Sequence, residues 1–238
     1  MHGTATRGRL LDRLGMLGGE PAIHIPRLAL VLATVWSASG LVLAAVAAAA
    51  SVTGRPVADF TREPVAALEE TTCAGADCAY IGFLSNAGLL VWAGTAAVSL
   101  LAGFLSRNPQ SDRGLAAPFL AFGLLTTVLA SDDAFQIHEL VAPALIDRGE
   151  SLLIGAYALV LAGLLVRYRS FVLRTDFGLL LVSGALFLVS AALDHWLPGL
   201  HLLEDGSKFV GIATWATWLV GTAIAVLRAS AGRADPAA

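Results

Sequence analysis

Long apolar stretches dominate this chain, and short polar segments separate them. Six such stretches lie at residues 27–50, 81–105, 115–137, 151–167, 176–196 and 205–227. A helix needs about 20 apolar residues to cross a bilayer, and these stretches have about that length. Glycine and alanine are frequent within them, which favours close helix packing in lipid. The pattern predicts an all-α integral membrane protein, a bundle of six transmembrane helices.

Composition supports the membrane class and divides the chain into three parts. Only 14% of the 238 residues are charged, whereas about 25% is usual in soluble domains. We expect residues 1–25 to form a cytoplasmic N-terminal leader, residues 26–228 to form the membrane domain, and residues 229–238 to form a disordered C-terminal tail. The arginines are spread over short segments and form no basic patch with aromatic residues, so we expect no nucleic-acid partner.

The distribution of positive charge orients the predicted helices. Of the 15 Lys and Arg residues, only Arg55, Arg62, Arg148 and Lys208 fall on the side opposite the termini. Lys and Arg accumulate on the cytoplasmic side of membrane proteins. We therefore expect both termini to be cytoplasmic and the opposite ends of the helices to face outward.

The predicted outer loop at residues 51–80 contains both cysteines of the chain. Cys73 and Cys78 would meet an oxidising exterior, which favours a disulfide that fastens the loop. A metal-binding pair is the alternative, although no histidine lies nearby. Residues 63–70 of the same loop are compatible with a short surface helix.

Three clusters of ionisable residues lie at the predicted outer ends of three apolar runs. They are Asp132, Asp133, His138 and Glu139; Asp194 and His195; and Glu204, Asp205 and Lys208. A charge near hydrocarbon costs roughly 2.5 to 3.5 kcal/mol on insertion scales, so it usually has a partner, water or a function. We expect the three clusters to converge on one pocket.

Helix periodicity suggests which of the residues in segment 131–139 point inward. If the third helix continues to Glu139, then Asp132, Gln136 and Glu139 share one face at i, i+4 and i+7. His138 and Asp133 then point to either side of that face. The alternative is a helix end in the polar interface, where charges are tolerated.

Two further runs carry similar patterns. In the fifth run Ser183, Phe187, Ser190 and Asp194 share a face, which favours either tight helix packing or a polar path towards Asp194. In the last run Glu204 and Lys208 are spaced for a local ion pair, and acids at a helix start also suit its dipole. The second run begins with Ser85 and Asn86, which could hydrogen-bond to the carboxylates.

Carboxylates with one or two imidazoles suit Zn, Mn or Fe in a helical bundle. The candidate ligands are Asp132, His138, Glu139 and Glu204, and the candidate catalytic residues are Asp194, Lys208 and Ser85. Asp133, Asn86, His195 and Asp205 would lie nearby. Without a metal, the same residues could form a proton relay or a cation site.

Three segments resemble a group of uncharacterised bacterial multi-pass membrane proteins. They are Leu84–Gly88, Ser131–Glu139 and Leu203–Gly211, and the group shows Asp-Asp-Leu-Phe-x-x-His-Glu and Glu-Asp-Gly-x-Lys-Phe-x-Gly. The resemblance implies a location in the bacterial cytoplasmic (inner) membrane. More distantly, the layout is similar to the membrane hydrolases that include alkaline ceramidases and progestin/adipoQ receptors. Their Ser, Asp and His zinc site has loose counterparts here, but their His-x-x-x-His pair and seventh span are missing.

Three hypotheses follow from these patterns. The first is a metal-dependent membrane enzyme, most simply a hydrolase of a lipid or other amphiphile, in which Lys208 orients an anionic substrate. The second is a cation- or proton-coupled transporter or channel that uses the same carboxylates. The third is a structural or accessory subunit with an ion-pair network around Lys208. Membrane lipids are the expected partners in each case, and the sequence specifies no oligomeric state.

Overall fold

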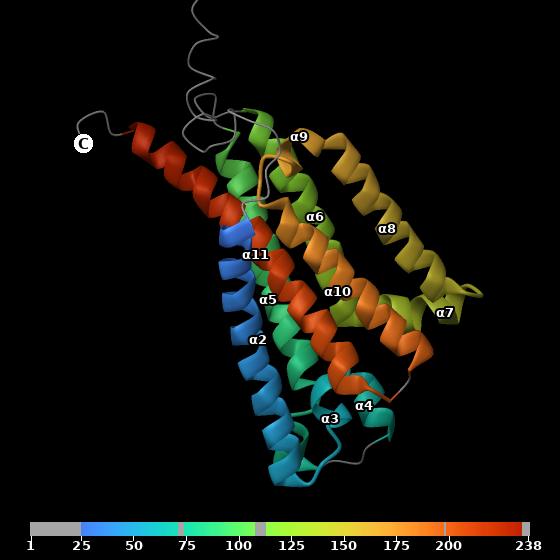
Figure 1. The fold of residues 1–238 in the computed structure, drawn as a ribbon. Helices are drawn as coiled ribbons and strands as arrows, with labels where there is room; N and C mark the ends of the chain where they lie inside the picture. The colour runs from blue at the N-terminus through green and yellow to red at the C-terminus, as the bar shows by residue number, and fades with distance from the viewer. Residues whose placement is uncertain (1–24, 71–73, 108–112, 198, 235–238) are drawn as a thin grey trace, which may run out of the picture. The chain divides into compact units, whose positions relative to one another are not determined.

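The computed structural model describes residues 25–70, 74–107, 113–197 and 199–234, and every regular element in them is a helix (Figure 1). The long helices are α2 (Ile25–Thr53), α5 (Phe83–Leu105), α6 (Arg113–Phe135), α8 (Gly149–Arg167), α10 (Phe177–Trp196) and α11 (His201–Ala234). Within the described ranges, 6 helices are long and apolar enough to cross a membrane. The predicted all-α class and the six spans are therefore confirmed.

Short helices fill the connections between the long ones. They are α3 (Ala58–Thr61), α4 (Pro64–Glu70), the 3₁₀ helix η1 (Gly75–Cys78), the π-helix η2 (Ile137–Val141), α7 (Ala142–Leu145) and α9 (Arg169–Val172). Helix α4 confirms the helix predicted at 63–70. The cytoplasmic leader lies outside the described residues except for Ile25. Cys73 is outside them as well, so its disulfide with Cys78 stays a prediction.

The last helix extends further than the sequence pattern indicates. Helix α11 continues to Ala234, so residues 229–234 are helical rather than part of a disordered tail. Three of these six residues are alanine, the strongest helix former. The helix therefore continues although the hydrophobicity of the chain falls after residue 228. Residues 235–238 lie outside the described chain.

The chain divides into two compact units. Among the described residues, unit 1 comprises residues 92–107, 113–177 and 218–234, and unit 2 comprises residues 25–70, 74–91, 178–197 and 199–217. Helices α5 and α11 contribute residues to both units. Each unit thus combines segments that are distant in sequence.

Unit 1 has an aromatic core. Phe122 makes an edge-to-face contact with Trp218, with ring centroids 5.1 Å apart, and Phe119 packs in the same way on Phe171 at 5.3 Å. The indole Nε1–H of Trp218 donates to Thr175 Oγ1 at 2.9 Å, which satisfies the polar end of a buried ring. These contacts fix the segment around α9 against α6 and α11.

Helices α5 and α6 pack closely through two glycines. A Cβ at Gly103 would lie 2.7 Å from Leu120 Cγ and 3.1 Å from the Leu120 backbone nitrogen, and a Cβ at Gly123 would lie 3.0 Å from Leu100 Cγ. Each glycine therefore receives a leucine from the facing helix. Small residues at such positions allow close helix approach in membranes.

We expect Gly103→Ala to lower the free energy of unfolding by about 1 to 3 kcal/mol, because the added methyl overpacks the contact with Leu120. Reversible unfolding of the detergent-solubilised protein measures the change. Gly94→Ala in the same helix is the matched control, since a Cβ there meets nothing within 4 Å. Equal stability of the two variants would contradict the close packing of α5 on α6.

Unit 2 holds α10 and α11 together through a polar contact. The Ser183 hydroxyl donates to the Gly211 carbonyl oxygen at 2.9 Å. A Cβ at Gly211 would lie 3.1 Å from the Phe187 ring, so these helices also approach closely. Ser183 therefore serves helix packing, which was the alternative to a polar path along this face.

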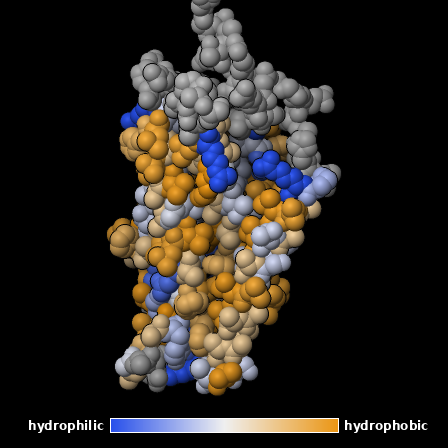
Figure 2. Space-filling view, turned by 90° about the vertical axis from the view of Figure 1, so that its left-hand side faces the viewer, coloured by the Kyte–Doolittle hydropathy of each residue, from blue (hydrophilic) through white to orange (hydrophobic). Residues whose placement is uncertain are grey.

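Apolar side chains remain widely exposed on the long helices, including Leu90, Leu159, Leu188 and Val166, each more than 70% exposed. Figure 2 shows hydrophobic residues over much of the described surface on the face that it presents. A soluble monomer rarely exposes apolar area on this scale. The surface is therefore that of a helical membrane protein.

Candidate functional site

The first polar cluster forms where α6 breaks in unit 1. Helix α6 ends at Phe135, Gln136 takes a left-handed conformation (φ 48°, ψ 45°), and the chain continues as η2. A non-glycine residue pays roughly 1 to 2 kcal/mol for this conformation, and π-helices are frequent at functional sites. The condition of a helix that continues unbroken to Glu139 is therefore not met, and the face shared by Asp132, Gln136 and Glu139 does not form.

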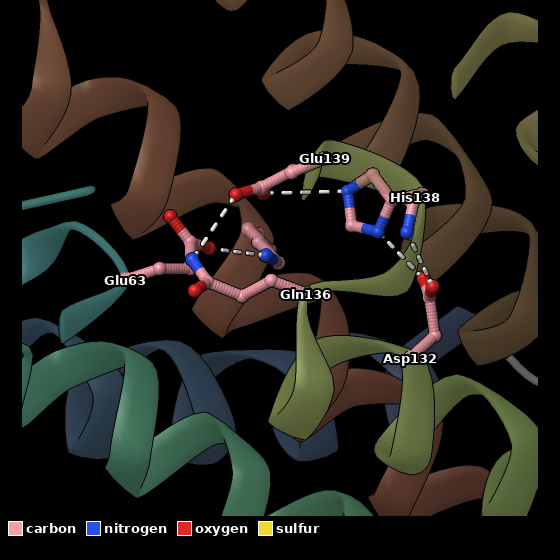
Figure 3. Close-up of polar contacts among 6 residues, drawn as sticks. Glu63, Asp132, Gln136, His138 and Glu139 are labelled. Atoms are coloured by element: carbon pink, nitrogen blue, oxygen red, sulfur yellow. Dashed lines mark hydrogen bonds and ion pairs between the residues drawn. The ribbon is translucent and has the colours of Figure 1, made fainter. Parts of the chain in front are cut away.

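Asp132 stabilises the break by accepting two hydrogen bonds from His138. Its Oδ1 accepts from the His138 backbone N–H at 2.9 Å, and its Oδ2 lies 2.6 Å from His138 Nδ1 (Figure 3). Asp132 is only 5% exposed. The turn at Gln136 brings His138 back onto a carboxylate that a continuous helix would have placed on another face.

A second carboxylate lies on the other side of the imidazole. His138 Nε2 is 3.3 Å from Glu139 Oε1, and the Gln136 side-chain amide donates to Glu139 Oε2 at 3.3 Å (Figure 3). Asp132, Gln136, His138 and Glu139 together are the His138 cluster. Its imidazole lies between two carboxylates.

This arrangement changes the acid–base behaviour of His138. Burial by itself lowers the pKa of the imidazole, but hydrogen bonds to Asp132 and Glu139 and their negative charges outweigh burial and raise the pKa to about 10. The ring is therefore a doubly protonated imidazolium at neutral pH, with one N–H directed at each carboxylate.

The His138 cluster does not have the form of a metal site. Both imidazole nitrogens face carboxylates, so neither presents a free lone pair. Among the residues that the structure describes, no three His, Cys, Asp or Glu side chains are arranged to hold a metal ion. Asp132, His138 and Glu139 are brought together as a hydrogen-bonded chain, whereas the fourth predicted ligand, Glu204, belongs to unit 2. The predicted Zn, Mn or Fe site has no support in these residues.

The second polar cluster lies in unit 2 and joins α11 to the start of α4. Lys208 Nζ lies 2.7 Å from Glu63 Oε1. Glu204, which the spacing allows to pair with Lys208, has its Oε2 3.7 Å from His201 Nδ1 and also feels the positive charge of Lys208. Glu63, Glu204, Asp205 and Lys208 together are the Lys208 cluster. Sequence reasoning missed Glu63, although an acid just before Pro64 at a helix start was an available signal.

Several other candidates do not lie in a buried site. Asp194, His195 and Asn86 are exposed, whereas Ser85 and Asp133 are half-buried. Asp194 was expected to point inward, but the last turn of α10 from Asp194 to Trp196 is exposed throughout. The buried residues of α10 lie near its beginning, at Gly178, Leu179, Leu180 and Ser183. Asp194 is therefore exposed rather than turned inward, and its catalytic role and the convergence of the three clusters stay predictions.

A groove lies in unit 2 along the helix that carries Lys208. It has a volume of about 280 Å³, and its lining is mainly apolar: Trp36, Gly40, Leu43, Leu186, Leu202, Leu203, Gly206, Ser207 and Val210. These residues come from α2, α10 and α11. The shape and lining suit a hydrocarbon chain.

Comparison with known proteins identifies the family. A family model described as a domain of unknown function, DUF8692, matches residues 28–222, and the chain belongs to this family. No curated protein and no solved structure matches the chain. The similarity to alkaline ceramidases and progestin/adipoQ receptors stays a prediction.

Proposed function

We propose that this protein transports protons across the membrane and binds the transported proton at the His138 cluster. The observation that carries the proposal is the imidazole of His138 between the Asp132 and Glu139 carboxylates, beside a broken helix. Carboxylate and histidine chains commonly conduct or store protons in membrane proteins. Broken helices commonly form the ion sites of transporters.

The two contacts of His138 differ, which gives the site a means of releasing its proton. Asp132 is held close by two hydrogen bonds, whereas Glu139 is more distant and lies on the π-helix η2. If η2 moves so that Glu139 leaves, one of the two carboxylates that raise the pKa of His138 is lost. The imidazole then binds its proton less tightly, so proton release is coupled to movement of η2.

Proton flux into liposomes tests this function. Purified protein is reconstituted with a pH-sensitive dye inside, and a potassium gradient with valinomycin drives protons inward. We expect His138→Gln to reduce the flux to that of empty liposomes, because the proton-binding ring is gone. His195→Gln is the matched control, since His195 is exposed and packs its ring against Trp196. Wild-type flux equal to that of empty liposomes would overturn the proposal.

The orientation inferred from the positive residues belongs to the same proposal. The protein would lie in the bacterial cytoplasmic membrane with both termini in the cytoplasm and the His138 cluster towards the outer face. Alkaline phosphatase fused after Ala234 should then be inactive, and the same enzyme fused after Ile146 should be active. An active fusion after Ala234 together with an inactive fusion after Ile146 would show the opposite orientation.

The groove in unit 2 favours a second candidate, an enzyme that acts on a membrane lipid or other amphiphile. An acyl chain would lie along Leu43, Leu186 and Val210, and Lys208 could attract an anionic head group. Incubation with total bacterial lipids followed by mass spectrometry tests this activity. No wild-type product beyond that of a Lys208→Met variant would exclude it.

A further inference from the structure

Asp205 and Thr61 present two buried oxygens without hydrogen-bond partners in unit 2. Asp205 on α11 is 7% exposed, and Thr61 at the end of α3 is 1% exposed. Among the described residues, neither Asp205 Oδ2 nor Thr61 Oγ1 has a hydrogen-bond partner. A buried polar group left unsatisfied costs about 1 to 3 kcal/mol, and more when it is charged. Such a pair therefore calls for an occupant.

The two side chains lie close together. The Thr61 hydroxyl is near enough to the Asp205 carboxylate for a weak hydrogen-bonding interaction, but the contact falls short of full hydrogen-bond geometry and neither oxygen has another partner among the described residues. The two residues are brought together from α3 and α11, which are distant in sequence. A small bound ion or molecule that contacts one oxygen of Asp205 and one oxygen of Thr61 would satisfy both groups.

The charges around this space favour a cation. The carboxylates of Glu63 and Glu204 act on Asp205 together with the ammonium of Lys208, and Asp194 and Arg62 act on Glu204. Four acidic side chains thus share the region with two basic ones. Lys208 lies 2.7 Å from Glu63 Oε1 and also acts on Asp205, so the acidic side chains of this region share its positive charge.

We propose that Asp205 Oδ2 and Thr61 Oγ1 are ligands of a bound Na⁺ ion. Carboxylate and hydroxyl oxygens suit hard cations, whereas soft metals prefer sulfur or imidazole. One charged oxygen beside one neutral oxygen matches a monovalent ion better than a divalent ion. The residues of this site belong to unit 2, and the proposal does not require that the protein transport protons.

Sodium-dependent thermal stability tests the site. The full-length protein in detergent micelles is melted while NaCl replaces N-methylglucamine chloride at constant ionic strength. We expect Tm to rise with Na⁺ and to saturate, with a weaker response to K⁺. Asp205→Asn should abolish the response, and Thr61→Val should weaken the apparent affinity for Na⁺ by at least about tenfold. Thr61→Ser, which keeps the hydroxyl, should retain the wild-type affinity for Na⁺.

Asp132→Asn is the matched control, because it removes another buried carboxylate and should leave the Na⁺ response intact. If Asp205→Asn does not fold, the comparison of Thr61→Val with Thr61→Ser carries the test. A wild-type Tm that is independent of Na⁺ would overturn the proposal in favour of a buried water. An equal response in Thr61→Val, or a response to Ca²⁺ without one to Na⁺, would also overturn it.

Discussion

Asp132→Ala is expected to lower the free energy of unfolding by about 3 to 5 kcal/mol, the usual cost of removing one partner from a buried ion pair. The loss would leave the His138 imidazolium with only the more distant Glu139. It would also strand the His138 backbone N–H, which donates to Asp132 Oδ1. The left-handed backbone at Gln136 would lose the contact that holds it.

Reversible unfolding in mixed micelles measures this effect, with Asp147→Ala as the control. Asp147 is exposed and belongs to the same unit, so its removal should change the free energy by no more than about 0.5 kcal/mol. Asp132→Asn keeps one oxygen for the backbone N–H, so its free energy of unfolding should lie between those of Asp132→Ala and Asp147→Ala. If the Asp132→Ala and Asp147→Ala variants have equal free energies of unfolding, the contacts of Asp132 do not hold the broken helix.

Raising the pH from 6.5 to above 10 is expected to remove the stability that the His138 ion pairs contribute. The pKa of His138 is raised to about 10 in the folded protein, against about 6.5 for a free histidine. The folded state therefore binds more protons across this range. The contribution is complete below pH 6.5 and is lost as the pH rises through 10, at no more than about 1.4 kcal/mol per pH unit.

The difference in stability between wild type and His138→Gln isolates this effect from other groups that titrate at high pH. We expect the difference to shrink steadily between pH 6.5 and 10. His195→Gln should follow the wild type throughout. A difference that is constant with pH would mean that His138 carries no extra proton in the folded protein.

Local sequence predicted part of the candidate site and missed part of its geometry. Asp132, His138 and Glu139 were identified because charges are rare beside such apolar runs. Their arrangement was not predicted, because residues 131–139 fit an unbroken helix equally well. The residue that breaks the helix is Gln136, which has no preference for the left-handed region comparable to that of glycine or asparagine.

Helix periodicity alone also did not identify Glu63 as a partner of Lys208. Glu204 lies one turn before Lys208 and could pair with it locally, but Lys208 pairs with Glu63, which is 145 residues away in the chain. Thr61 was not identified at all, since a threonine in a connecting segment carries no signal of burial. Its proximity to Asp205 depends on how α3 packs against α11.

The sequence by itself determined the six apolar helices and the positions of the charged clusters at their ends. Helix formation in lipid is local, because every backbone group must be satisfied within its own segment. Only the tertiary structure decided that His138 turns back onto Asp132, that Lys208 binds Glu63, and that Asp205 is buried beside Thr61. These contacts join segments whose meeting depends on packing, and the strain at Gln136 persists only because the surrounding contacts hold it.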